Sequence, residues 1–215
     1  MKLIRCTTMT ALSAMFLFFA ASSPLHAQLG KGLFDANTAS PSELQALPNM
    51  TPAIVKNMVD KRPFLTILDL NAFLLGQKLT QAQATEFYRK AFVQINLNTG
   101  SPEEFMMVPG SGKRMSAEFA EYRPWKNWLQ FDKEIGKYVG QQETDRFKQY
   151  MFIPINLNTA SDELLLTIPG VTPAMVQGMK KARPWKAKDE DFEFILGKIV
   201  GAKDARRIGR YLATP

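Results

Sequence analysis

Residues 98–125 read NTGSPEEFMMVPGSGKRMSAEFAEYRPW, and this stretch decides the fold because the chain repeats its pattern. The opening Asn-Thr-x-Ser, the hydrophobe-Pro turn and the closing Arg-Pro-aromatic step recur in residues 37–64 and 158–185. The copies keep one register, with offsets of 61 and 60 residues between successive copies. Three motifs that stay in step over three copies identify an internal repeat, so the chain is expected to consist of tandem structural units.

Each copy predicts a helix, a tight turn and a second helix. Ser101 is an N-cap candidate, and Glu104 three residues later completes a capping box. The first helix must end at Pro109, because proline cannot continue a helix, and a second helix is predicted from Lys113 to the Arg-Pro step. The other copies carry the same signals at Ser40, Glu43, Pro48, Thr51 and Pro52 and at Ser161, Pro169, Thr172 and Pro173, with Leu164 in place of the glutamate.

The repeat sets the organisation of the chain. After a short leader at residues 28–34, three units are expected at residues 35–94, 95–154 and 155–215. The second half of each unit carries a Leu-Gly or Val-Gly step followed by a polar, helix-forming stretch, which predicts a second, degenerate hairpin. No strand-like alternation of any length is visible. The expected fold class is therefore all-α, as tandem helix-hairpin-helix repeats in three units of about 60 residues.

The first residues have the pattern of a secretory signal peptide. Lys2 and Arg5 give a positive start, an apolar run follows, and Ala27 supplies a small residue at the expected cleavage site. The apolar run is about half the roughly 20 residues that a membrane-spanning helix needs, which favours a cleaved signal over an anchor. We therefore expect residues 1–27 to be removed and the protein to be periplasmic or secreted.

Composition excludes several kinds of chemistry. The 215 residues include one cysteine and one histidine, Cys6 and His26, and both lie in the expected signal peptide. The remaining chain can form no disulfide, no thiolate or imidazole site and no Cys/His zinc site. No nucleophile elbow or phosphate-binding Walker loop is present either. We therefore expect a protein that is not an enzyme and that needs no metal or cofactor.

The repeated unit resembles the helix-hairpin-helix family. The opening Asn-Thr-Ala-Ser, followed by a short helix, a hydrophobe-Pro-Gly turn and a second helix, is most similar to ComEA-type secreted DNA-uptake proteins. The resemblance covers essentially residues 35–215, as three tandem copies. It implies sequence-independent binding of double-stranded DNA, in which backbone N–H groups of a Gly-x-Gly turn and nearby basic side chains contact phosphate.

Only the middle unit keeps the whole turn that the resemblance requires. The phosphate-binding residues that it implies there are Gly110, Ser111, Gly112, Lys113 and Arg114. The third unit retains one glycine, and the expected contacts are Gly170 and Thr172; the first unit has Asn49-Met50-Thr51 instead. The middle unit carries 8 basic and 8 acidic residues, so any attraction for DNA there must come from a local arrangement of charge.

Three further signals each have two interpretations. A second basic patch is possible at the C-terminus, from Lys198, Lys203, Arg206, Arg207 and Arg210, but these residues can equally form a solvated helix face. The Arg-Pro-aromatic step suits base stacking, but its fixed place in the repeat favours a helix end whose aromatic closes the core. The acidic run at residues 189–191 suits a cation or, more simply, the start of a helix.

Two functional hypotheses follow. The first is a secreted, sequence-independent DNA-binding protein that acts in DNA capture or uptake. The second is a non-catalytic scaffold for protein–protein interaction in the cell envelope, a role served by the extrinsic subunit U of photosystem II, which the unit also resembles. A DNA-binding protein should gather basic side chains beside its turns, whereas a scaffold should show dispersed charge and exposed apolar side chains.

Overall fold

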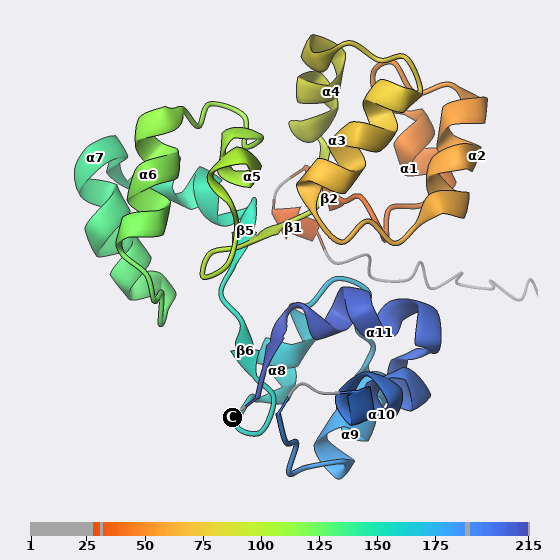
Figure 1. The fold of residues 1–215 in the computed structure, drawn as a ribbon, viewed down its shortest axis with the longest axis vertical. Coiled ribbons are helices and arrows are strands. Elements are labelled where there is room, and N and C mark those ends of the chain that lie inside the picture. The colour runs from red at the N-terminus through yellow and green to blue at the C-terminus, as the bar shows by residue number, and fades with distance from the viewer. Residues whose placement is uncertain (1–27, 31, 188–189, 215) are drawn as a thin grey trace, which may run out of the picture.

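The computed structural model describes residues 28–30, 32–187 and 190–214, so the expected signal peptide lies outside the described residues. Within them the chain forms three helical lobes joined by extended segments near the centre (Figure 1). The first lobe runs from β1 to β3, the second from β4 to β5 and the third from β6 to β7. The described chain is mostly helical, as the sequence predicts.

The elements follow one order in each lobe. The first lobe contains β1 (Gln28–Gly30), β2 (Leu33–Asp35), α1 (Pro41–Gln45), α2 (Pro52–Lys61), α3 (Ile67–Gly76), α4 (Gln81–Tyr88) and β3 (Ala91–Phe92). The second contains β4 (Ile95–Asn96), α5 (Pro102–Met106), α6 (Lys113–Glu121), α7 (Trp128–Lys148) and β5 (Met151–Phe152). The third contains β6 (Ile155–Asn156), α8 (Asp162–Leu166), α9 (Pro173–Lys181), α10 (Glu190–Val200), α11 (Ala202–Gly209) and β7 (Leu212–Ala213).

Short strands that the sequence did not predict close each lobe. Parallel pairing joins the strand that directly precedes the helices of each lobe to the strand that follows them, as β2 with β3, β4 with β5 and β6 with β7. In the first lobe β1 also pairs with β2, in antiparallel orientation. In the second lobe the N–H of Ile95 donates to Tyr150 O and the N–H of Leu97 donates to Phe152 O, both at 2.9 Å. Strands of two residues carry no period-two pattern, which is why the all-α expectation omitted them.

The predicted helix starts and stops are confirmed. Capping boxes form at Ser40 with Glu43 and at Ser101 with Glu104, whereas Ser161 caps α8 without a glutamate partner. Each first hairpin turns through one residue with positive φ, which is Asn49 at 63°, Gly110 at 81° or Gly170 at 76°. Glycine adopts this conformation without steric cost, and asparagine tolerates it better than most other residues.

The second half of each lobe also contains two helices that meet at a residue with positive φ. Lys78 occupies this place between α3 and α4, and Gly201 precedes α11. In the second lobe the two helices run together as α7, which kinks at Gly140, where φ is 76° and ψ is 170°. Each lobe is thus two helical hairpins closed by a strand pair.

The Asn-Thr and Arg-Pro-aromatic motifs bind each other. In the second lobe the Asn98 amide donates to Trp125 O at 3.0 Å, and its carbonyl oxygen accepts the N–H of Trp125 at 2.6 Å. The Arg123 guanidinium donates to Leu97 O at 2.7 Å. The same contacts form in the other lobes, through Asn37, Phe64 and Arg62 and through Asn158, Trp185 and Arg183.

The aromatic residue of each step is part of the core. Phe64, Trp125 and Trp185 are at most 4% exposed. The indole N–H of Trp125 donates to Phe119 O at 2.8 Å, so the ring is fixed from both ends. A ring in this position cannot stack on a nucleobase. The interpretation of the step as a helix end that closes the core is therefore confirmed, and the base-stacking alternative is wrong.

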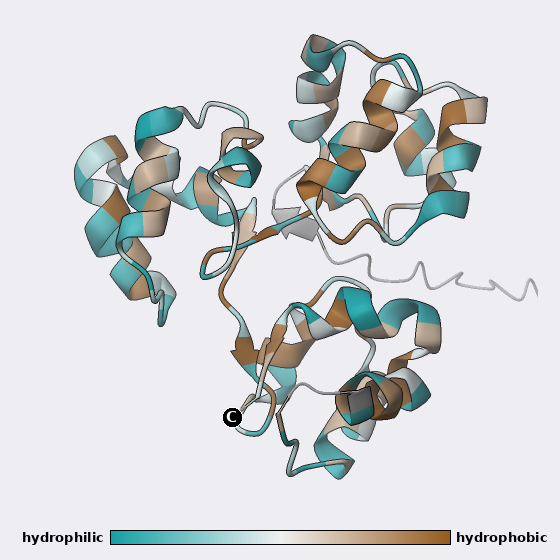
Figure 2. Cartoon of the chain, in the orientation of Figure 1, coloured by the Kyte–Doolittle hydropathy of each residue, from teal (hydrophilic) through white to brown (hydrophobic). Residues whose placement is uncertain are grey.

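Two hydrophobic cores hold the lobes. The first and second lobes share one continuous core, in which Phe92 packs edge-on against Tyr150 with 4.9 Å between ring centroids. The third lobe has a core of its own, built around Trp185, Leu196 and Ile208. Figure 2 shows hydrophobic residues along the extended segments between lobes and on one side of several helices. Burial of these faces supplies the main stabilisation of the fold.

Replacement of Asn98 by alanine tests the mutual binding of the two motifs. Asn98→Ala removes both hydrogen bonds to Trp125 and leaves a backbone N–H and C=O without their partner. We expect a loss of about 2–4 kcal/mol in the free energy of unfolding, measured by urea denaturation and tryptophan fluorescence. Asn57→Ala, at an exposed position of α2, is the matched control and should change stability by less than about 0.5 kcal/mol. Equal stability of the two variants would contradict the role of Asn98.

Candidate functional site

The turn of the second lobe leaves the start of α6 open. Gly112 is the N-cap residue of α6, and it provides no side-chain cap. In α2 and α9 the hydroxyl oxygens of Thr51 and Thr172 accept the N–H of Ile54 and Met175, both at 3.3 Å. The α6 terminus therefore keeps more uncapped N–H donors than its two counterparts, and the helix dipole makes such a terminus attractive to anions.

The residues of this turn are exposed where the sequence predicts contact. Gly110, Gly112, Lys113 and Arg114 are exposed, and nothing lies within 4 Å of the position that a Cβ of residue 112 would occupy. Neither Lys113 nor Arg114 forms an ion pair with a carboxylate of the described residues. Ser111 is half-buried, and its hydroxyl oxygen has no hydrogen-bond partner in the described chain. The predicted contacts of the middle unit are thus brought together on one accessible turn.

Arg146 is a basic residue at this turn that the sequence analysis missed. Its Nη2 lies 3.0 Å from the place of a Cβ at residue 110. Glu143, three residues earlier on α7, accepts from its Nε at 2.8 Å. The hydrogen bond lowers the pKa of Glu143 and raises the pKa of Arg146. The Glu-x-x-Arg spacing in the sequence indicates an i,i+3 pair on a helix. The sequence does not predict the kink at Gly140 that directs this pair to the turn.

The turn of the third lobe is covered by the first lobe. A Cβ at Gly170 would lie 2.9 Å from Arg207 Nη2 and 3.0 Å from Thr38 Cγ2, so both side chains sit on this turn. Thr172 uses its hydroxyl to cap α9. The structure therefore does not give Gly170 and Thr172 the open geometry of Gly110 and Gly112, although the sequence predicted phosphate contacts at both turns.

The turn of the first lobe is bridged by amide side chains. Asn49 replaces the first glycine, and its side-chain oxygen accepts from Gln83 Nε2 at 3.0 Å. In the other two lobes the side chain that reaches the turn is an arginine, Arg146 or Arg207, in place of Gln83. The first turn thus lacks both glycines of the second turn and is bonded to α4 instead.

The expected C-terminal basic patch is divided between the surface and the interior. Lys198, Lys203 and Arg206 are exposed on the third lobe. Arg207 is only 4% exposed and donates to Pro169 O at 2.5 Å and to Asp204 at 2.7 Å. Arg210 donates to Gln94 O at 2.6 Å, at the junction of the first two lobes. The expectation of one basic face from all five residues is wrong, because Arg207 and Arg210 make contacts inside the protein.

A buried carboxylate lies at the junction of the first and third lobes. Asp35 is 2% exposed, and its Oδ1 accepts the N–H groups of Asn37 and Thr38 at 2.9 and 3.0 Å. Burial raises the pKa of Asp35, while the positive charges of Arg207 and Arg210 act in the opposite direction. The charges of these two arginines thus partly offset the cost of burying Asp35.

Other expected sites can be placed only in part. Helix α10 begins at Glu190, within the acidic run at residues 189–191, and Asp189 lies outside the described residues. The described residues contain no group of three or more His, Cys, Asp or Glu side chains arranged to hold a metal ion. None of the helices in the described part of the chain has the length and hydrophobicity that crossing a bilayer requires.

No protein-family model, no curated protein and no solved structure matches this chain. The geometry of its own residues is therefore what bears on its function. The accessible turn of the second lobe combines uncapped N–H donors with Lys113, Arg114 and Arg146. This combination suits an anion with several oxygen atoms, such as a phosphate group.

Neighbouring arginines on α11 test the buried contacts that Arg207 makes at the turn of the third lobe. Arg207→Gln removes the hydrogen bonds to Pro169 O and Asp204. It also removes a positive charge that offsets the burial of the Asp35 carboxyl group. We expect a loss of about 3 kcal/mol in the free energy of unfolding, measured by urea denaturation. Arg206→Gln is the matched control, because its side chain is 68% exposed and reaches Glu193 only at 3.8 Å. Its effect should stay below about 0.5 kcal/mol, and an equal loss in both variants would refute a special role for Arg207.

Proposed function

We propose that this protein is a secreted, sequence-independent binder of double-stranded DNA, built from three tandem helix-hairpin-helix units and similar in role to ComEA-type DNA-uptake receptors. The observation that carries the proposal is the open N-terminus of α6. The N-cap residue there is Gly112, which has no side chain to cap the N–H donors beside Lys113 and Arg114. Phosphate is the chemical group of DNA that this arrangement suits, and the protein performs no catalysis in this role.

The chemistry of the turn defines the kind of binding. Backbone N–H groups and guanidinium or ammonium groups contact the phosphate oxygens, which are the same for every base pair. Such contacts release counterions from DNA, so affinity falls as salt rises. Arg146 adds guanidinium N–H donors at the turn, while its ion pair with Glu143, through Nε at 2.8 Å and Nη2 at 2.5 Å, offsets its charge. One turn of this kind makes few phosphate contacts, so the affinity of a single protein is expected to be modest.

A protein-scaffold role is the second candidate, and one contact favours it. Thr38 of the first lobe sits on the Gly170 turn of the third, so this protein already uses a hairpin turn to bind protein. Large apolar side chains are also exposed, with Leu129 at 78% and Phe194 at 63%. Both features fit a module that binds envelope proteins. They do not account for the unpaired Lys113 and Arg114 at the one open turn, which is why DNA is the preferred ligand.

A DNA titration tests the proposal. The purified protein is mixed with a labelled random-sequence duplex at about 50 and about 200 mM salt, and binding is followed by fluorescence anisotropy. We expect affinity to fall steeply with salt, with a slope of about 0.9 in log K against log salt for each phosphate contact. Gly112→Asp combined with Lys113→Glu should abolish most binding, because it places negative charge at the turn.

The control for this titration makes the same change in charge on α2 of the first lobe, at its capped start and at its end. Thr51→Asp preserves an N-cap residue of α2, and Lys61→Glu alters an exposed residue at the end of the same helix. This pair should retain most of the wild-type affinity. Absence of wild-type binding at the lower salt concentration would overturn the proposal and favour the scaffold role. Equal losses in both double variants would show that only net charge matters.

A further inference from the structure

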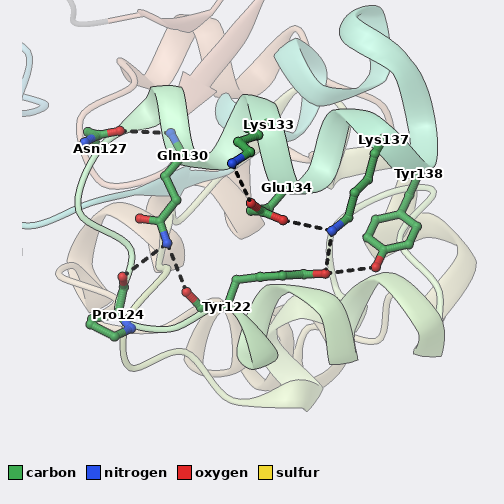
Figure 3. Close-up of polar contacts among 8 residues, drawn as sticks. All are labelled: Tyr122, Pro124, Asn127, Gln130, Lys133, Glu134, Lys137 and Tyr138. Carbon is green, nitrogen blue, oxygen red and sulfur yellow. Dashed lines mark hydrogen bonds and ion pairs between the residues drawn. The ribbon is translucent and has the colours of Figure 1, made fainter.

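At the C-terminal end of α6, Tyr122 shares with α7 a polar network that the repeat does not require (Figure 3). Lys137 Nζ donates to Tyr122 Oη at 2.7 Å and to Glu134 Oε2 at 2.8 Å. The hydroxyl groups of Tyr122 and Tyr138 lie 3.0 Å apart and share a hydrogen bond. The network thus ties the last residue before the Arg-Pro step to the segment of α7 that precedes the kink.

The ring of Tyr138 carries two cations. Arg114 Cζ lies 5.1 Å from the ring centroid, and Lys137 Nζ lies at the same distance. Both distances fall within the range of cation–π attraction. The ring therefore holds Arg114, a residue of the first turn of α6, beside Lys137 on α7.

The network belongs to the second lobe alone. The residue that follows the first position of the helix is Arg114 in α6 but alanine in α2 and α9, at Ala53 and Ala174. The residue before the Arg-Pro step is Tyr122 in the second lobe but Lys61 and Ala182 in the others. The other lobes fold without these residues, so the network is not a structural requirement of the unit. It coincides with the one turn that keeps both glycines.

The charges of the network remain in place at neutral pH. Hydrogen bonds to Glu134 and Tyr122 raise the pKa of Lys137, which therefore stays protonated. The hydrogen bond to Tyr122, with burial and the neighbouring Glu118, raises the pKa of Tyr138 to about 12, so its hydroxyl stays neutral. Lys137 keeps one N–H beyond its bonds to Tyr122 and Glu134, and the Arg114 guanidinium is unpaired with any carboxylate of the described residues.

We propose that Arg114 and Lys137, held on the ring of Tyr138, form a second phosphate contact beside the α6 turn. Tyr138 is then a positioning residue for the two cations, and Tyr122 positions Lys137. The second lobe would grip two phosphate groups of the backbone, one at the N–H donors of Gly112 and Lys113 and one at this pair. The inference rests on the proposed function, since it names the residues that extend the same DNA site.

The experiment compares salt dependence among variants of the full protein by fluorescence anisotropy with the random-sequence duplex. Lys137→Gln should lower the slope of log K against log salt by about 0.9, the value of one phosphate contact. Tyr138→Leu should weaken binding several-fold and reduce the slope, because Arg114 loses the ring that holds it, whereas Lys137 keeps its contacts with Tyr122 and Glu134. Tyr138→Phe retains the ring and should restore most of the affinity. Lys61→Gln, an exposed lysine at the end of α2, is the matched control and should keep the wild-type slope.

The outcomes separate this inference from the function on which it rests. Absence of DNA binding by the wild-type protein would overturn both. Wild-type binding with unchanged slopes in Lys137→Gln and Tyr138→Leu would overturn the second contact alone. Melting temperatures of all variants are measured in parallel, and loss of binding by Tyr138→Leu supports the inference only if the protein remains folded. The slope measured for Lys137→Gln is sufficient to test the second contact, because Lys137 is exposed and its replacement leaves the core intact.

Discussion

The structure depends on the hydrogen bonds between the asparagine of each Asn-Thr motif and the backbone of the aromatic residue after each Arg-Pro step. In the second lobe Asn98 accepts from and donates to Trp125, and Arg123 donates to the residue before Asn98. These bonds tie the start of a lobe to the end of its first hairpin across 27 residues. They hold together the two ends of the segment that contains the first hairpin and its turn.

Because the scaffold is secured elsewhere, the turn itself is free to diverge. The first lobe bridges its turn with Asn49 and Gln83, the third places its turn against Thr38, and the second leaves Gly110 and Gly112 open. The same fold thus yields one structural turn, one turn that binds protein and one turn suited to phosphate.

The sequence predicted the features that depend on neighbouring residues. Capping at Ser101 and the turn at Gly110 follow from local chemistry, and the structure has both. It did not predict the strand pairs, since Ile95–Asn96 is too short for any period. Nor could it distinguish Arg206 from Arg207, which are identical in type but exposed and buried respectively. Arg207 packs against the turn of its own lobe, where it donates to Pro169 O across 38 residues of sequence, and helical spacing does not predict this contact.

The most direct test of the account follows backbone amides by NMR during titration of the isotope-labelled protein with random-sequence duplex DNA. If phosphate binds at the open turn, the amide signals of Gly112, Lys113 and Arg114 should shift most. The amides at the starts of α2 and α9 should barely move, because a threonine caps each of those helices. Shifts centred on α2 or α9, or no shifts at all, would contradict the claim that the second lobe carries the site.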